Sequence, residues 1–407
     1  MTACDMAAAL PGATADGCTL LGWVGARPAG EGLAVYWAPP RDFAPGEAVR
    51  GPQAAVPQVR RTHGLLGVRP AGRWGLLCGV NEHGVAAAAA PTRTRLSGAG
   101  PGLAGPDVVR LALERAAGAR QALDAAADLV ARHGPGDAHD HALFITDKQE
   151  GFLLTTCGPH WAVQQVGRVR AANEVCCVRQ DWDRLSRGLS DLAIARGWQA
   201  ADGNKLDFAG ALALPGPDDR AALRRWGQAT LRLEQQYGVL GVGALRRLLG
   251  RLVEDAAGPA TPAVGFVART GPAGVAGPTA WLAFGPAEEH VYLPLVPEAE
   301  PPAAFGGEDC PAWRRLTQPR GAGGRADRRR ALAALQSRLD QAAAEYAGEA
   351  AGLRRGGDAE GLRRLAGSFM QHNWERFEEV WEEVASGEPG ADAPGERPRR
   401  LHLPSGG

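Results

Sequence analysis

The sequence predicts an α+β fold in which β-sheets and helices form separate layers. Runs of strand-like segments are followed by runs of helix-like segments, instead of alternating with them one by one. Two consecutive apolar segments are joined by the short polar turn Lys148-Gln149-Glu150, which is typical of an antiparallel hairpin. No glycine pattern of a dinucleotide or phosphate loop occurs where a strand precedes a helix. These three observations favour layered α+β over a doubly wound parallel sheet.

The first strands are expected where short apolar runs alternate with Gly and Pro, over residues 18–24, 33–37, 74–80 and 85–90. One helix is predicted from Pro106-Asp107 to His133, because apolar residues recur at helical spacing and Gly134-Pro135 follows. Strands resume over residues 142–147, 151–155 and 161–163. A further amphipathic helix is expected over residues 245–253, before strands over 263–267, 280–284 and 291–293.

The composition changes after this last strand, which predicts a first domain over residues 4–297. A linker rich in Pro and Gly follows over residues 298–325. Residues 326–386 are rich in Ala, Glu and Arg and are predicted to form a C-terminal helical segment. The tail over residues 387–407 is predicted to be disordered.

The composition also excludes several classes of protein. The 407 residues suffice for one large or two ordinary domains, and 45% hydrophobic residues indicate a folded globular protein. Because 45 Lys and Arg balance 45 Asp and Glu, the chain lacks the basic surface expected of a nucleic-acid-binding protein. No apolar run is long enough for a membrane span, and no signal-peptide pattern follows Met1. With seven irregularly spaced cysteines, this predicts a cytoplasmic location.

Cys4 is the candidate nucleophile. A cysteine at the N-terminus of a mature chain carries its own base, because the α-amino group has an unperturbed pKa of about 8 and can accept the thiol proton. For Cys4 this requires the removal of Met1, Thr2 and Ala3. Judged by position alone, Cys4 is more simply explained as part of a structural terminus.

Eight motifs resemble, in order and spacing, those of the secernin and dipeptidase family of N-terminal-nucleophile (Ntn) cysteine hydrolases. They are Cys4-Asp5-Met6 and residues 22–28, 79–85, 107–116, 132–134, 158–162, 181–184 and 195–198. The resemblance implies a four-layer αββα Ntn-hydrolase sandwich with C-terminal helices and a cytosolic location. It also implies a cysteine-type exopeptidase (dipeptidase) in which Cys4 attacks a small peptide amide and forms a thioester.

Three further residues are substrate-binding candidates. Arg27 is kept where the family has an Arg, and a guanidinium binds a substrate carboxylate bidentately. Asn81 belongs to the turn Asn81-Glu82-His83-Gly84, which recurs in the family and is also explained as an ordinary hairpin turn. Asn173 matches a family Asn if the alignment shifts by one residue. Either Asn81 or Asn173 is a candidate replacement for a missing oxyanion donor.

Other family positions are substituted. Active members carry Gly-Lys-Asn-Ser-Asp-Arg where this chain has residues 22–27, so their Lys and Asp are absent and Trp23 stands in place of the Lys. Ala89 stands at the position of an oxyanion-hole Asn, and a carboxylate at Glu174 would repel an oxyanion. Losing one such donor typically lowers the rate about 100- to 1,000-fold. Two hypotheses stay open: a dipeptidase of weak activity, and a catalytically degenerate relative that binds a protein partner through residues 374–383.

We expect no cofactor and no metal site. His139-Asp140-His141 has no further ligand at suitable spacing and is predicted to be a solvated loop. Cys176 and Cys177 are adjacent and would point to opposite faces of a strand, which disfavours a shared metal. The expected partner of an active enzyme is a small peptide, and that of a degenerate relative is a protein or a second copy of this chain. Neither nucleic acid nor a membrane is expected.

Overall fold

The fold is described from a computed structural model of the chain. The structure describes residues 3–27, 31–51, 54–98, 100–216, 219–271, 277–308, 310–318 and 325–386. Met1, Thr2, Pro28 and the predicted disordered tail over residues 387–407 lie outside these ranges.

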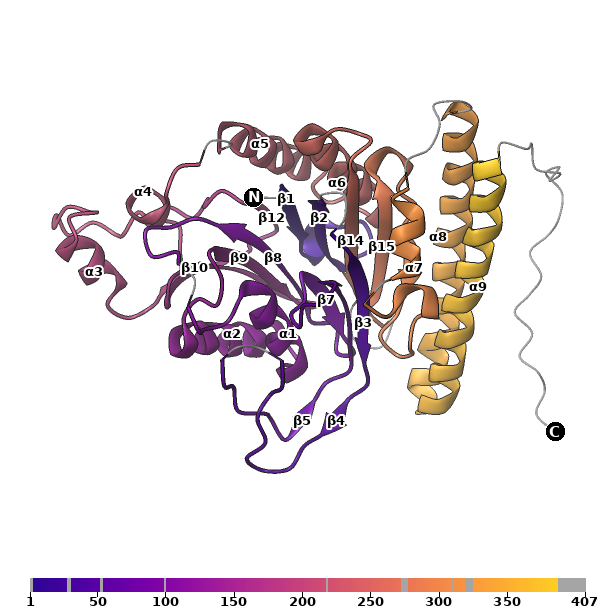
Figure 1. Cartoon of the computed structure of the whole chain (residues 1–407), viewed down its shortest axis with the longest axis horizontal. Helices are drawn as coiled ribbons and strands as arrows, with labels where there is room; N and C mark the ends of the chain where they lie inside the picture. The colour runs from indigo at the N-terminus through magenta and orange to yellow at the C-terminus, as the bar shows by residue number, and fades with distance from the viewer. Residues whose placement is uncertain are drawn as a thin grey trace.

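Two antiparallel sheets pack face to face at the centre of the molecule (Figure 1). The smaller sheet consists, in spatial order, of β12 (Val169–Asn173), β1 (Cys4–Ala9), β2 (Thr19–Ala26), β14 (Pro262–Thr270), β15 (Thr279–Pro286) and β16 (Leu293–Leu295). The larger sheet consists of β13 (Arg184–Leu185), β11 (His160–Gln165), β10 (Gly151–Cys157), β9 (Asp140–Thr146), β8 (Ala86–Thr92), β7 (Cys78–Asn81), β6 (Leu65–Pro70) and β3 (Leu33–Ala38). A short ribbon of β4 (Arg41–Asp42) and β5 (Arg61–Thr62) projects from the larger sheet (Figure 1).

Helices cover the outer face of each sheet. α5 (Asp219–Gln235) and α6 (Val242–Ala257) contact β12, β1, β2 and β14, while α1 (Gly105–Arg115) and α2 (Ala119–His133) contact β7 to β11. The predicted four-layer αββα sandwich is therefore confirmed. The shorter helices are α3 (Leu189–Ala195), α4 (Phe208–Leu212) and the 3₁₀ turns Pro11–Ala13, Ala287–Glu289 and Ala303–Phe305.

Small residues allow these layers to approach closely. All six residues of β1 are buried, because the strand lies between β12 and β2 with α6 on one side and the larger sheet on the other. At Gly22 in β2, an added Cβ would lie 2.9 Å from a methyl group of Leu249 in α6. β8 begins with five alanines, and strand side chains alternate between the two faces of a sheet. The first, third and fifth alanines therefore pack against the smaller sheet, and the second and fourth against α1. The centre of β1 is thus inaccessible to solvent.

Two predictions for the larger sheet and its helices are wrong. The single helix expected from Pro106 to His133 is two helices, because the backbone becomes extended at Ala116 and α2 begins anew after Gly118, where Asp147 accepts a hydrogen bond from the Ala119 N–H (2.8 Å). The segment His139-Asp140-His141 is not a solvated loop. Asp140 and His141 are buried in β9. Burial of Asp140 is tolerated because donors surround its carboxylate, including Thr94 Oγ1 (2.6 Å) and the Gly158 N–H (2.7 Å).

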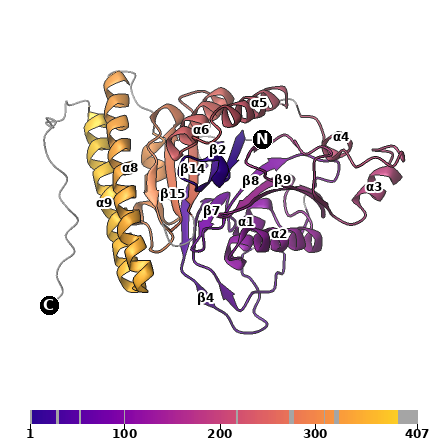
Figure 2. The ribbon, with the colours of Figure 1, turned by 180° about the vertical axis from the view of Figure 1, so that it is seen from behind.

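The C-terminal helices form an antiparallel pair beside β16. α8 (Arg325–Gly356) and α9 (Ala359–Ser386) lie side by side in both views (Figures 1 and 2), and α7 (Pro311–Leu316) lies between them and β15. Trp374 and Trp381 are buried, and Trp374 contacts Phe305 edge-on at 4.8 Å between ring centroids. The tryptophans of the expected partner-binding segment therefore contact this chain's own core. Whether residues 326–386 form a separate domain stays a prediction.

No helix within the described ranges is both long and apolar enough to cross a membrane. The cytoplasmic location stays a prediction.

Candidate active site

Cys4 is the first residue of β1, and its side chain is buried with 4% exposure. Its thiol donates a hydrogen bond to the backbone carbonyl of Ala89 in β8 (3.7 Å). Burial raises the pKa of the Cys4 thiol well above its ordinary value, and the carboxylates of Glu174 and Asp5 raise it further, whereas Arg27 opposes them. The thiol is therefore protonated at neutral pH, and a protonated thiol is a poor nucleophile.

Trp23 covers the side of Cys4 that faces the larger sheet. In the β1–β2 ladder Cys4 pairs with Gly25 and Met6 pairs with Trp23, so all four lie on the same face. The indole lies over Gly25, where an added Cβ would be 2.6 Å from the ring. Its Nε1–H donates to the carbonyl of Ala89 (2.9 Å), the same oxygen that accepts from the Cys4 thiol. The indole therefore fills the space over Gly25, the ladder partner of Cys4, and converges with the thiol on one carbonyl oxygen.

A buried ionic network lies on the opposite side of Cys4. Arg225 in α5 donates through Nε to Asp5 (2.9 Å) and through Nη2 to Glu174. The second oxygen of Glu174 accepts a hydrogen bond from the Cys4 backbone N–H (3.4 Å). Burial raises the pKa of Asp5 to about 6; Arg225 opposes this increase, and the nearby negative charge of Glu174 adds to it. Although burial opposes it, these two carboxylates raise the pKa of Arg225, which holds its charge.

Asn173 is brought next to this network. It pairs with Asp5 in the β12–β1 ladder, and its Nδ2 donates to Asp5 (3.1 Å) and to the carbonyl of Ala222 (2.8 Å). Its Oδ1 accepts from the Val175 N–H (3.1 Å). Both amide hydrogens are thus used within the chain. Asn173 positions Asp5 and does not direct a donor toward Cys4.

Asn81 is the last residue of β7. The first residue of that strand, Cys78, pairs with Ala88, the neighbour of Ala89, so Asn81 lies at the far end of β7 from the Cys4 site. Its Nδ2 donates to the last carbonyls of the α1 region, at Leu113 (2.9 Å) and Ala116 (2.7 Å). Its Oδ1 accepts from the N–H groups of the following turn. Because Asn81 is fully buried and its donors are used internally, it holds the β7–β8 turn against α1 and does not reach Cys4. This placement fits the interpretation of Asn81 as part of a hairpin turn and does not fit a substrate-binding role.

Arg27 lines a cavity of about 590 Å³ at the amino-terminal side of Cys4, which we call the Arg27 cavity. Arg27 contacts the Trp23 ring (5.7 Å) and pairs with Glu31 (3.5 Å). Within the described residues its Nε is buried without an acceptor. The lining residues comprise Ala3, Ala26, Arg27, Arg93, Glu174, Val175, Cys176, Ala213, Leu214, Gly216, Asp219, Ala221, Arg225, Ala256, Ala257 and Thr261.

Cys176 and Cys177 lie in the loop after β12 and not in a strand, so the alternation expected of them is wrong. Cys176 is buried and lines the Arg27 cavity, while Cys177 is half-buried. Both thiols have a pKa raised by burial. Sequence reasoning also missed Arg225, since no helix was predicted over residues 219–235. The signal that could have revealed this helix is its recurring Ala and Leu at helical spacing.

No protein-family model matches the chain. Two variants of conjugated bile acid hydrolase from Clostridium perfringens are similar over 69% of this chain and 89% of theirs, with 11% and 12% identity and TM-scores of 0.39 and 0.38. The Caenorhabditis elegans ortholog of N-acylethanolamine-hydrolyzing acid amidase is similar over 42% of this chain and 70% of its own, with 15% identity and a TM-score of 0.28. These TM-scores are too low to assign a function, so the site rests on this chain's own contacts.

Proposed function

We propose that this chain is a secernin-like Ntn-hydrolase scaffold whose Cys4 site is closed, and that it binds small peptide-like carboxylates in the Arg27 cavity without hydrolysing them. The carbonyl of Ala89 is the observation that carries the proposal. It accepts hydrogen bonds from both the Cys4 thiol and the Trp23 indole. Catalysis of acyl transfer needs donors where the oxyanion develops, and a carbonyl acceptor beside the sulfur opposes that charge.

The charged residues that line the Arg27 cavity support a ligand that carries a carboxylate. Three arginines, Arg27, Arg93 and Arg225, line it together with two carboxylates, Glu174 and Asp219. Arg225 is committed to its buried carboxylate partners, whereas the ion pair of Arg27 among the described residues is with Glu31, whose side chain is 53% exposed. A carboxylate of the ligand would compete with Glu31 for the Arg27 guanidinium. A volume of about 590 Å³ suits a small ligand such as a dipeptide.

A dipeptidase that acts after removal of residues 1–3 is the second candidate, and one observation favours it. Ala3 lines the Arg27 cavity, so its removal would expose the amino group of Cys4 at the cavity wall. That nitrogen lies 3.4 Å from Glu174, whose carboxylate would stabilise the protonated amine. An ammonium group cannot accept the thiol proton. This candidate therefore predicts slow hydrolysis through a thioester at Cys4.

Ligand binding is tested by calorimetry on the full chain with a panel of unmodified and C-terminally amidated dipeptides. We expect saturable binding of the free carboxylates, weakened at least tenfold by amidation and by Arg27→Gln. Arg41→Gln changes an exposed arginine on β4 and should leave the affinity unaltered. Equal binding of amidated and free peptides would contradict the assigned role of Arg27.

Turnover is tested with two forms, the full chain and a chain cut to begin at Cys4. Each is compared with its Cys4→Ser variant in a dipeptide hydrolysis assay. We expect no difference between the thiol and serine forms of either chain. Hydrolysis by the chain that begins at Cys4, lost on Cys4→Ser, would establish the second candidate and reject the closed site.

A further inference from the structure

Two histidines and a glutamate converge where the loop before β6 meets the turn between β7 and β8. His63 Nδ1 lies 2.9 Å from His83 Nε2, and Glu82 Oε1 lies 3.6 Å from the first atom and 3.9 Å from the second. In the part of the chain that the structure describes, this is the group of three potential ligands whose atoms all lie within 4.8 Å of one another. We propose that His63, Glu82 and His83 bind one Zn²⁺ ion.

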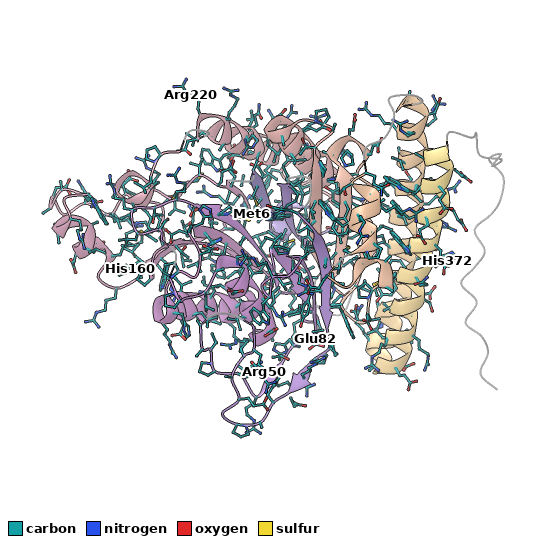
Figure 3. The ribbon with its side chains drawn as sticks, viewed as in Figure 1. Met6, Arg50, Glu82, His160, Arg220 and His372 are labelled. Atoms are coloured by element: carbon teal, nitrogen blue, oxygen red, sulfur yellow. The ribbon has the colours of Figure 1, made fainter. Side chains whose placement is uncertain are left out.

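The proposed zinc site is separate from the Cys4 site. None of its three residues lines the Arg27 cavity. Figure 3 labels Glu82 well below Met6, which is two residues from Cys4 on β1. The inference therefore does not depend on the proposed function.

The spacing of the three ligand atoms matches a tetrahedral metal with small adjustments. Bonds of about 2.0–2.2 Å at tetrahedral angles place the ligand atoms of zinc about 3.3–3.5 Å apart. The observed separations of 2.9, 3.6 and 3.9 Å lie on both sides of this range. Rotations of the two imidazole rings and of the carboxylate, each moving an atom by less than about 1 Å, would bring all three to a common centre.

The backbone holds the three residues in place before any metal binds. Glu82 donates its N–H to the Gly64 carbonyl (2.8 Å), and the Gly64 N–H donates to Glu82 Oε1 (3.0 Å), so the turn and the loop are tied twice. The His83 N–H donates to Asn81 Oδ1 (3.0 Å), and Asn81 in turn is anchored to α1. Gly84 has a φ of +82°, which this tight turn requires. Such preorganisation lowers the cost of ordering the ligands on binding.

The donor set selects the kind of metal. Two imidazole nitrogens and one carboxylate oxygen are typical of Zn²⁺ sites that keep one position for water, whereas Mg²⁺ and Ca²⁺ prefer oxygen ligands. The His83 side chain is 41% exposed, so a water molecule can complete the coordination from solvent. Without metal, the same atoms form a hydrogen bond between two rings in an edge-on arrangement, with centroids 4.3 Å apart. A metal titration separates these two explanations.

The test is a calorimetric Zn²⁺ titration of the full chain after chelator treatment and dialysis. We expect one ion per chain at a site whose affinity falls at least tenfold in His83→Ala and in Glu82→Gln. His372→Ala changes an exposed histidine on α9 (Figure 3) and should leave the affinity unaltered. Cys177→Ser is the thiol control, because Cys177 is the half-buried cysteine and thiolates also bind zinc.

Co²⁺ provides a spectroscopic probe of the same ligands. Visible absorption of tetrahedral Co²⁺ should appear with one equivalent, be displaced by Zn²⁺ and be lost in His83→Ala. Because the His83 side chain is partly exposed, this variant is expected to fold, and its circular dichroism spectrum checks this. Absence of stoichiometric binding to the wild-type chain would overturn the proposal. Binding of one ion that persists in the folded His63→Ala/His83→Ala double variant would overturn it too.

Discussion

Asp5 makes the stability of the protein depend on pH in the direction opposite to that of most carboxylates. Burial raises its pKa to about 6 in the folded chain, against 3.8 in the unfolded chain. A carboxyl group with a raised folded pKa stabilises the folded state below its unfolded pKa, and this contribution is lost as the pH rises through the folded pKa. At about 1.4 kcal/mol per pH unit, the difference corresponds to about 3 kcal/mol, lost between roughly pH 4 and pH 6.5.

Asp5→Asn removes the titrating group and keeps the size of the side chain. Urea denaturation of both chains from pH 4 to pH 7.5 gives the difference in unfolding free energy at each pH. Relative to the variant, the wild-type chain should lose about 2 kcal/mol or slightly more across this range, because part of the full difference is already lost at pH 4. Altered hydrogen bonds to Arg225 and Asn173 add a constant offset, which does not affect the slope.

Asp16→Asn is the matched control, because, although partial burial opposes it, the hydrogen bond and charge of Arg269 lower the pKa of Asp16. There the sign reverses: the wild-type chain should gain stability over its variant as the pH rises. The gain should be small, because the Asp16 side chain is 44% exposed and solvent screens the pair. A difference between the wild-type chain and Asp5→Asn that does not vary with pH would refute the reasoning. So would a wild-type gain on raising the pH, which would mean that Arg225 keeps Asp5 ionised.

Three further substitutions test the contacts around the site. Trp23→Ala should lower the unfolding free energy by about 3–5 kcal/mol in urea denaturation and speed the alkylation of Cys4; an unchanged alkylation rate would mean that the indole does not cover the thiol. Arg225→Met leaves two buried carboxylates without their counter-charge and should cost about 3–5 kcal/mol, whereas Arg220→Met, on the exposed face of α5, should cost almost nothing. Asn81→Ala should cost at least about 2 kcal/mol, because buried carbonyls and N–H groups lose their partners; thermal unfolding that matches the wild type would reject its anchoring role.

Elements whose signal lies in neighbouring residues could be predicted from the sequence. The hairpin around Lys148 and most of the longer strands of both sheets were expected from short apolar runs bounded by turn residues, whereas no strand was expected over β1, β6 or β12. The only local signal for the break between α1 and α2 is Gly118, because Ala116 and Ala117 are compatible with a helix. A contact distant in sequence adds to it: Asp147, in the β9–β10 turn, accepts from the first N–H of α2.

The candidate site depends on contacts that no local pattern encodes. Arg225 and Asp5 are 220 residues apart in the chain, and Asn173 meets Asp5 only through the register of the β12–β1 ladder. The sequence suggested which positions differ from an active enzyme. It could not indicate that Trp23 lies over Gly25 and shares the Ala89 carbonyl with Cys4. The proximity of His63 to Glu82 and His83 likewise follows from the pairing of β6 with β7, which places Leu65 opposite Asn81, and from no recognised ligand spacing.

The reactivity of the Cys4 thiol tests the closed site most directly. The native full chain is treated with iodoacetamide at neutral pH, and each cysteine is followed by mass spectrometry over time. Because Cys4 is buried, protonated and covered by Trp23, its alkylation should be slower than that of half-buried Cys177 and should reach the rate of Cys177 only in urea. Faster alkylation of Cys4 than of Cys177 in the native chain would contradict the closed site and indicate that Cys4 is a reactive nucleophile.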